Sequence, residues 1–420
     1  MSKVLNKTLA RNRAEWRRKA EVVEDKPATF GPDIDLSKFG TPTEKEKVES
    51  LKSLSRQAKE AALYAGIDAD ESFRAGSYFQ IDHSVIYERV QKAYQGQLEI
   101  MSTSEALEKY DWVSDLWWKA VQVDQDKYTA LAELKHTHGY FIRVFKGQRI
   151  ERPIQACLFL AENHISQNVH NLIVIEDGAE AQIITGCTLN PRVEEGLHVG
   201  ISEFFLGKNA ALMFTMIHNW AEDFDVRPRT GAVLEDNATF VSNYILLRPV
   251  RSIQMFPAAF LNGKNSRARF NTILYGVKDS YIDVGSKAVL SNKETRAEAI
   301  ARAVARDQSQ IYARGQLIGQ VNESRAHLDC RGILFSDEAQ IRAIPELFAE
   351  KAPLSELSHE AAISPIAEEE VEYLMARGLS KEEAVSTITR GFLNIDIPGL
   401  PRVLQGYIQQ VLDAATKEAL

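Results

Sequence analysis

The sequence predicts a mainly β protein, a parallel β-solenoid (parallel β-helix) with a helical region before it and a small helical domain after it. Three observations predict this fold. An internal repeat runs through the middle of the chain, alternating apolar residues fill the same region, and the apolar spacing becomes helical on both sides of it. We expect an N-terminal region at residues 1–135, a solenoid core at 136–360 and a terminal helical domain at 361–420.

The N-terminal region has the irregular apolar spacing of short helices. Val48, Leu51, Leu54 and Ala58 recur at helical intervals, and a further helix is expected at residues 103–121. The N-terminus is basic but also contains Glu15, Glu21 and Glu24, and it lacks the apolar stretch of a signal peptide. We therefore expect a solvated helix there and no targeting segment.

The middle of the chain repeats a polar corner, then a small residue, then alternating apolar positions. The small residues are Ala179, Ala210, Ala238, Ser266, Ser280, Thr295, Ser309, Ser324 and Ala339, and the steps between them are 31, 28, 28, 14, 15, 14, 15 and 15 residues. A step of 14–15 residues fits one strand and one corner, so two steps make one turn of a solenoid. An antiparallel sandwich is the alternative, but the regularity of the last five steps favours the solenoid.

The chain after residue 361 changes to helical spacing. Ser364 followed by Pro365 is typical of a helix start, and Gly378 is expected to end that helix. The sequence from Ser380 to Glu383 has the pattern of a capping box that opens a second helix, which Gly391 is expected to end. A last helix is expected at residues 402–412.

Composition excludes several classes of function. The net charge of −8 argues against nucleic acid as the main partner, and the apolar runs are far too short to cross a membrane. The three cysteines are far apart and odd in number, which predicts a reducing cytoplasm rather than a disulfide framework. The chain contains no CxxC, HExxH or GxxxxGK[ST] sequence, so the commonest zinc and nucleotide sites are absent.

Four segments stand out along the chain: GYFIRVFKGQRIERP at 139–153, ITGCTL at 184–189, LSHEAAIS at 357–364 and ARGLSKEEA at 376–384. Together they resemble the SufB/SufD scaffold family. The resemblance covers about residues 136–420, and the combination of these segments is specific although each alone is weak.

The resemblance implies a right-handed β-helix core that dimerises through its end. It also implies a C-terminal helical domain that docks a SufC-like ABC-type ATPase, and sulfide supplied by a cysteine desulfurase or another source. The expected function is therefore a cytoplasmic scaffold subunit for Fe–S cluster assembly, without ATPase activity of its own. Its expected cargo is a transient cluster, with [4Fe–4S] favoured.

The chain departs from the family at one place. Bacterial scaffold members carry a cysteine in the segment that matches residues 345–357, and this chain has none there. The chain is then either a homodimeric, archaeal-type scaffold with another ligand, or a SufD-like structural partner that holds no cluster by itself. A carbohydrate-active β-helix enzyme is a third class, but the sequence lacks the secretion signal and the row of acidic residues that it needs.

Cys330 and His359 are the predicted cluster ligands. They are separated by 29 residues, which fits one complete turn, so we expect them to stack on neighbouring coils about 4.8 Å apart. Thiolate binds iron strongly, and imidazole is a weaker donor that eases release of a cluster. The flanking Asp329 and Arg331 predict a polar setting that stabilises the Cys330 thiolate.

The other candidates have weaker support. Glu360 is a predicted ligand only if its strand bends, because in a straight strand it points away from His359. Cys187 precedes Cys330 by 143 residues, so we expect it on the same side about five turns, or roughly 24 Å, away. It is predicted to accept sulfur, with a plain core residue as an equal alternative, and Cys157 is predicted to be core. His164, His170, His198, His218 and His327 have no ligand spacing and are given no role.

Overall fold

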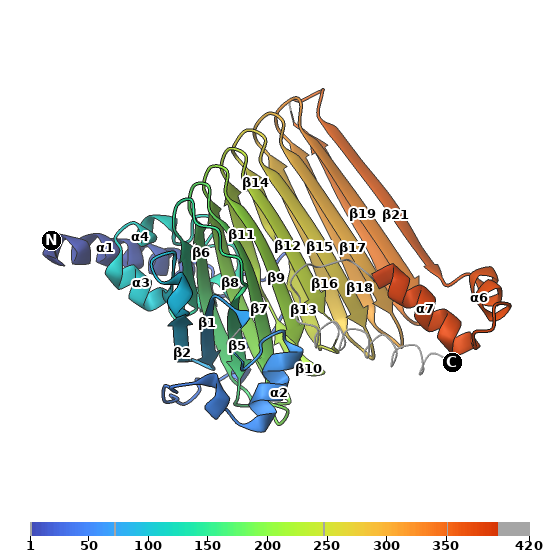
Figure 1. Ribbon diagram of the computed structural model, residues 1–420, viewed down its shortest axis with the longest axis horizontal. Helices are drawn as coiled ribbons and strands as arrows, with labels where there is room; N and C mark the ends of the chain where they lie inside the picture. The colour runs from blue at the N-terminus through green and yellow to red at the C-terminus, as the bar shows by residue number, and fades with distance from the viewer. Residues whose placement is uncertain (1, 71–72, 247, 351, 394–420) are drawn as a thin grey trace.

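Two long, facing β-sheets form a parallel β-solenoid. The computed structural model describes residues 2–70, 73–246, 248–350 and 352–393. Figure 1 shows the strands stacked side by side along the molecule, with helices α1, α3 and α4 at the N-terminal end and α6 and α7 at the other. The predicted solenoid is therefore confirmed.

Sheet I has ten strands in the order β2-β1-β5-β7-β9-β12-β15-β17-β19-β21. They are β1 (Gly76–Ile81), β2 (Ser84–Val90), β5 (Ile154–Leu160), β7 (Glu180–Leu189), β9 (Ala211–Asn219), β12 (Thr239–Leu246), β15 (Arg267–Gly276), β17 (Arg296–Ala305), β19 (Arg325–Leu334) and β21 (Glu356–Pro365). Neighbouring strands are parallel, except that β2 is antiparallel to β1.

Sheet II has eleven strands. They are β3 (Leu98–Ser102), β4 (Tyr140–Val144), β6 (Ser166–Ile175), β8 (Glu195–Leu206), β10 (Asp223–Val226), β11 (Arg229–Leu234), β13 (Ser252–Met255), β14 (Ala258–Leu261), β16 (Tyr281–Leu290), β18 (Gln310–Gly319) and β20 (Gln340–Ala349). Pro228 separates β10 from β11, and Pro257 separates β13 from β14. Proline has no N–H to give to a sheet, so each pair is one long strand interrupted once.

Each coil of the solenoid gives one strand to each sheet. From β5 to β21, strand pairing in sheet I joins residues 28 to 31 positions apart, for example Thr239 with Arg267 and Arg325 with Glu356. The steps of 14–15 residues are thus single strands with a corner, as the repeat predicts. The small third residues of the corners are all buried.

Left-handed backbone at the corners explains their composition. The residue just before the small position has a positive φ in several coils, including Gly178 (68°), Asn209 (58°), Asn237 (58°) and Asn265 (55°). Glycine and asparagine adopt this conformation at the lowest cost, so they mark the turns that a chain of β-branched residues could not make.

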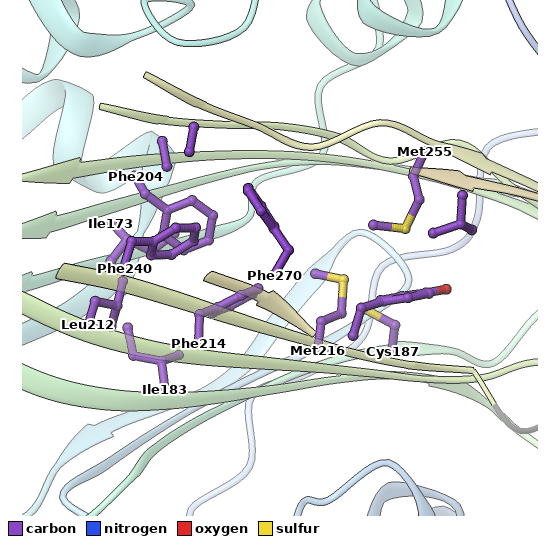
Figure 2. Packing of buried hydrophobic residues seen from close by; sticks show 14 of the residues in the cluster. Ile173, Ile183, Cys187, Phe204, Leu212, Phe214, Met216, Phe240, Met255 and Phe270 are labelled. Atoms are coloured by element: carbon purple, nitrogen blue, oxygen red, sulfur yellow. The ribbon is translucent and has the colours of Figure 1, made fainter. Parts of the chain in front are cut away.

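The space between the two sheets, here called the lumen, is filled by side chains. Phe204, Phe214, Phe240 and Phe270 pack together in it, with ring centroids 4.7 to 6.3 Å apart along the series (Figure 2). Met216 and Cys187 belong to the same buried cluster. The lumen is therefore a packed core in its middle and not an open channel.

The N-terminal region packs on the outside of both sheets, with residues 48–69 against sheet I and its other helices against sheet II. Its helices are α1 (Ser2–Glu21), α2 (Arg56–Tyr64), α3 (Thr103–Lys109), α4 (Val113–Leu116) and α5 (Lys127–Leu134), with short 3-10 turns at Leu36–Lys38, Leu51–Ser53 and Lys92–Tyr94. The buried Glu203 of β8 accepts backbone N–H groups of Trp118, Ala120 and Val121 at 2.6 to 3.0 Å. The predicted helix at 103–121 is split into α3 and α4, and β1 to β3 were not foreseen in this region.

The C-terminal part begins later than its sequence predicts. Strand β21 runs to Pro365, and the first helix is α6 (Glu368–Met375) rather than one starting at Pro365. Gly378 has a φ of 99° and ends that helix, and Ser380 and Glu383 form the expected capping box of α7 (Lys381–Leu393). Gly391 lies inside α7 and does not end it. The predicted last helix at 402–412 lies outside the described residues.

No helix in the described part of the chain is both long and apolar enough to span a membrane.

Candidate functional site

The last coil, formed by β20 and β21, is the open end of the solenoid. β20 pairs only with β18, and β21 pairs only with β19, so each strand leaves one edge without a partner among the described residues. Leu347 is in register with the lumen residue Leu317, yet 37% of its surface is exposed, and the neighbouring Phe348 is 43% exposed. Apolar side chains and unpaired strand edges thus meet at one end of the molecule.

Cys330 and His359 lie on adjacent strands and point to the same side, into the lumen. They are not directly opposite, however, because Cys330 pairs with Ala361 and His359 pairs with Leu328. The predicted stacking is therefore wrong by two residues. The last coil contains 31 residues in sheet I instead of 29, since Arg325 pairs with Glu356. A strand spacing of 4.8 Å and a rise of 3.3 Å per residue put the two Cα atoms about 8 Å apart.

Cys330 lies one coil inside the open end. It is 3% exposed, and the small side chain of Ala361 occupies the matching position on the last strand. Burial is the main cause that raises the pKa of the thiol to about 11, with a further increase from Asp329. Asp329 points to the outer face, where it accepts hydrogen bonds from Arg302 at 2.6 Å and Arg331 at 3.1 Å. The expected stabilisation of the thiolate by its polar neighbours is therefore not found.

His359 presents a nitrogen without a partner. Its side chain is half-buried, and its Nε2 atom is enclosed but makes no hydrogen bond in the described structure. A buried donor or acceptor that makes no bond costs free energy, so such an atom at a domain end points to a missing ligand or partner.

Glu360 lies on the opposite side of β21 from His359. Its carboxylate pairs with Arg331 at 3.0 Å on the outer face, where Glu360 is in register with Asp329. The strand stays straight to Pro365, so the bend that would have brought Glu360 into the site does not occur. Within one chain, Glu360 therefore cannot share a metal with Cys330 and His359.

Cys187 lies on the lumen side of β7, which is five strands away from β19 in sheet I, as its spacing predicts. The preceding Gly186 faces outward, where an added Cβ would meet the Ala65 carbonyl oxygen at 2.4 Å. The glycine thus lets the segment after α2 pack directly on the sheet, and alternation along the strand turns Cys187 inward. Cys187 is fully buried, and this burial raises the pKa of its thiol. Cys157 is also fully buried, which confirms its predicted core position.

Cys187 has two histidine neighbours that sequence reasoning missed. One ligand atom each of Cys187, His198 and His218 lies within 4.8 Å of the others, and all three residues are buried. His218 is paired with Cys187 across β7 and β9, whereas His198 comes from β8 of the opposite sheet. The 31-residue interval from Cys187 to His218 equals the step between Ala179 and Ala210, so the repeat contained the signal for that pair.

The chain therefore belongs to a class of β-solenoid proteins that carry cysteine and histidine side chains inside the coils and have an open terminal coil. The family model described as SUF system FeS cluster assembly, SufBD core domain, matches residues 158–392. This match spans more than half of the chain, so the chain belongs to the SufBD family of iron–sulfur cluster assembly proteins.

Curated relatives agree with this membership. An iron–sulfur cluster assembly SufBD family protein of Methanothermobacter thermautotrophicus (strain Delta H) is 46% identical over 406 residues, which cover 95% of this chain and 98% of that protein. A protein of the same description from Archaeoglobus fulgidus is 46% identical over 362 residues, or 86% of this chain and 96% of that protein. The iron–sulfur cluster assembly protein SufB of Bacillus subtilis is 26% identical over 376 residues, or 87% of this chain and 79% of that protein.

Proposed function

We propose that this chain is a cytoplasmic scaffold subunit for Fe–S cluster assembly, working as a homodimer that holds a transient cluster at its open end coil. The observation that carries the proposal is the enclosed, unpartnered Nε2 of His359, one strand away from the Cys330 thiol in the same lumen. Iron and sulfide are the cargo here, and the side chains bind them temporarily.

The open end coil supports assembly of two copies. Two protomers related by a two-fold axis would place their end coils face to face and cover Leu347 and the free edges of β20 and β21. Such a dimer would bring together two thiols and two imidazoles. Mixed ligation of this kind binds a cluster less tightly than four cysteines, which suits a protein that must release it. The [4Fe–4S] type remains our expectation.

A SufC-like ABC-type ATPase is the proposed partner of the C-terminal helices. Helix α6 exposes Tyr373 (57%) and Met375 (43%), which are apolar side chains of the kind that interfaces cover. The sequence has no phosphate-binding glycine loop, so ATP hydrolysis is assigned to the partner. A cysteine desulfurase or another donor would supply the sulfide.

The predicted role of Cys187 as a sulfur acceptor is a hypothesis that rests on the family resemblance alone. Its thiol is fully buried and its raised pKa keeps it protonated, so a donor protein could not reach a reactive thiolate without opening the coil.

A SufD-like structural subunit that holds no cluster by itself is the second candidate. Two observations favour it: the segment 345–357 has no cysteine, and Cys330 is almost fully covered with a raised thiol pKa. The two candidates differ in one measurable property, which is the iron bound by the chain alone.

Anaerobic reconstitution with iron and sulfide tests the proposal. The parent protein should bind iron and sulfide and show the absorption of a cluster, whereas Cys330→Ser and His359→Ala should each lose most of the bound iron. Cys157→Ser is the matched control, because it removes another buried thiol far from the end coil. If the parent binds no cluster while remaining folded, the structural-subunit candidate holds. If Cys330→Ser and His359→Ala both bind as much iron as the parent, the site is wrong.

A further inference from the structure

The Cys187 cluster, which consists of Cys187, His198 and His218, is a set of three metal-ligand side chains outside the proposed cluster site. Cys187, His198 and His218 are 0%, 1% and 2% exposed, and their ligand atoms converge within 4.8 Å. Three donors that bind one zinc ion, with Zn–S near 2.3 Å and Zn–N near 2.0–2.1 Å, lie about 3.3–3.8 Å apart. The three ligand atoms, which lie within 4.8 Å of one another, would have to approach by about 1–1.5 Å at most to bind one ion.

The hydrogen bonds of Gln167 fix which nitrogen of His198 is available to a metal ion. The amide nitrogen of Gln167 donates to the backbone carbonyls of Asp82 and Phe159 at 2.9 and 3.4 Å, which leaves its amide oxygen facing His198 Nδ1 at 3.0 Å. An amide oxygen only accepts hydrogen bonds, so Nδ1 carries the proton and the lone pair is on Nε2. Metal-binding histidines are commonly oriented by such a contact.

The Nδ1 atom of His218 also makes a hydrogen-bond contact, here with a hydroxyl group that can either donate or accept. Its Nδ1 lies 2.9 Å from the hydroxyl of Tyr244, and its Nε2 is buried with no hydrogen-bond partner in the described structure. An unpartnered imidazole nitrogen is costly in a packed lumen, and a metal ion would remove that cost. The cysteine and the two histidines come from three different strands, β7, β8 and β9, so a bound ion would tie the two sheets together across the lumen.

From this geometry we infer that Cys187, His198 and His218 form a buried binding site for one thiophilic transition-metal ion of the Zn²⁺ and Fe²⁺ class. One thiolate and two imidazoles are the donors that such ions select over the oxygen ligands of Mg²⁺ and Ca²⁺. Binding would displace the Cys187 proton, and three protein donors would leave one tetrahedral position for another ligand.

The site is separate from the proposed cluster site. Cys187 lies five strands from Cys330 in sheet I, a distance of about 24 Å at the usual strand spacing. The inference therefore does not depend on the end coil, and Cys330→Ser should leave the metal in place. Bound metal would also occupy the Cys187 thiolate, so the inference competes with the sulfur-acceptor hypothesis.

Zinc content after refolding tests the site, because a buried site is loaded most readily as the chain folds. The full-length protein is unfolded with a chelator under reducing, anaerobic conditions, refolded with Zn²⁺ and desalted, and its zinc is measured by mass spectrometry. We expect one Zn²⁺ per chain in the parent, in Cys157→Ser and in Cys330→Ser, and almost none in Cys187→Ser or His218→Gln. Co²⁺ in place of Zn²⁺ should give a thiolate charge-transfer band that Cys187→Ser abolishes.

Tyr244→Phe is a second test for the case that the ligand variants fail to fold. It keeps the aromatic ring but removes the contact to His218, so we expect a roughly 10- to 100-fold weaker affinity for Zn²⁺ in competition with a chromophoric chelator. The inference is overturned if folded parent protein retains no zinc, or if Cys187→Ser retains as much as the parent. It is also overturned if the parent carries sulfane sulfur on Cys187 and no metal.

Discussion

The side of a strand on which a residue lies decides whether its side chain faces the lumen or the solvent. Cys187, Cys330 and His359 all face the lumen, and Glu360, one position from His359, faces solvent. Alternation along a strand made that difference predictable. The match between coils was not predictable to the residue, because the last coil adds one residue in the corner before β20 and one in the corner between β20 and β21, and the second of these lacks the usual corner sequence. Ser355, whose hydroxyl lies 2.7 Å from that of Ser324, marks the true corner at an interval of 31.

The histidines of the lumen were missed for a different reason. His218 is one coil from Cys187 in the same sheet, so the repeat length could have identified it. His198 lies in the opposite sheet and meets the other two across the lumen. The distance across a solenoid depends on how the two sheets pack, and that is not encoded in the spacing within one sheet.

Asp82 gives a pH prediction at the residue scale. It is fully buried in the turn between β1 and β2, and burial raises the pKa of its carboxyl from 3.8 to about 6. The folded state therefore favours the protonated form, so the stabilisation is present below pH 3.8 and is lost as the pH rises through about 6. The full loss is on the order of 3 kcal/mol, at about 1.4 kcal/mol per pKa unit.

Asp82→Asn should remove this pH dependence. Asparagine keeps the acceptor for the Ala161 N–H (2.7 Å) and tolerates the positive φ of 51°. Urea unfolding at about pH 4 and about pH 7 should give a variant that is more stable than the parent at the higher pH, with a smaller difference at the lower pH. An equal difference at both pH values would mean that folding does not raise the pKa of Asp82.

Whole coils are specified by their corners more than by their strands. In sheet I the corners carry Asn209, Asn237 and Asn265, all with positive φ, on three successive coils. Their side chains form a ladder, in which Asn237 donates to Asn209 at 3.1 Å and Asn265 donates to Asn237 at 2.9 Å. The corner residues explain why the repeat was visible in the sequence. The strands themselves vary, because many apolar combinations fill a lumen equally well.

Two substitutions of Asn237 separate the contribution of the side-chain ladder to stability from the contribution of the left-handed backbone. Asn237→Ala loses both ladder bonds and places a Cβ residue in the left-handed region, so we expect a loss of about 1–2 kcal/mol in the free energy of unfolding. Asn237→Gly loses the bonds but adopts the backbone freely, so its loss should be smaller. Denaturant unfolding of the two variants measures the difference. A glycine variant less stable than the alanine variant would show that backbone strain is unimportant at this corner.

At the scale of the whole molecule, the two ends have different roles. The N-terminal region packs on the outer faces of both sheets, and Glu203 anchors its backbone to sheet II. The other end exposes its last coil and carries the C-terminal helices beside it (Figure 1). The sequence predicted the solenoid and both helical flanks. It did not predict that strands β1 to β3 extend the sheets into the N-terminal region, because these strands carry no corner repeat.

The C-terminal helices are predicted to dock the ATPase. Truncation after Ser364 should abolish co-purification with a SufC-like ATPase, and Tyr373→Glu within the intact chain should weaken it, because that side chain is exposed on α6. Circular dichroism should show that the truncated chain keeps its β structure. Full retention of binding by the truncated chain would assign the docking surface to the solenoid instead.

The most direct test of a site shared by two end coils is to separate the copies without touching the ligands. Leu347→Glu places a charge on the exposed lumen side of the last coil, and Val22→Glu changes an exposed apolar residue (79%) in the N-terminal region as the matched control. Light scattering and iron content after anaerobic reconstitution are measured on the same samples. We predict a monomer with little iron for Leu347→Glu, and a dimer with the parent's iron for Val22→Glu. A monomeric Leu347→Glu protein that binds as much iron per chain as the parent would contradict a cluster held between two copies.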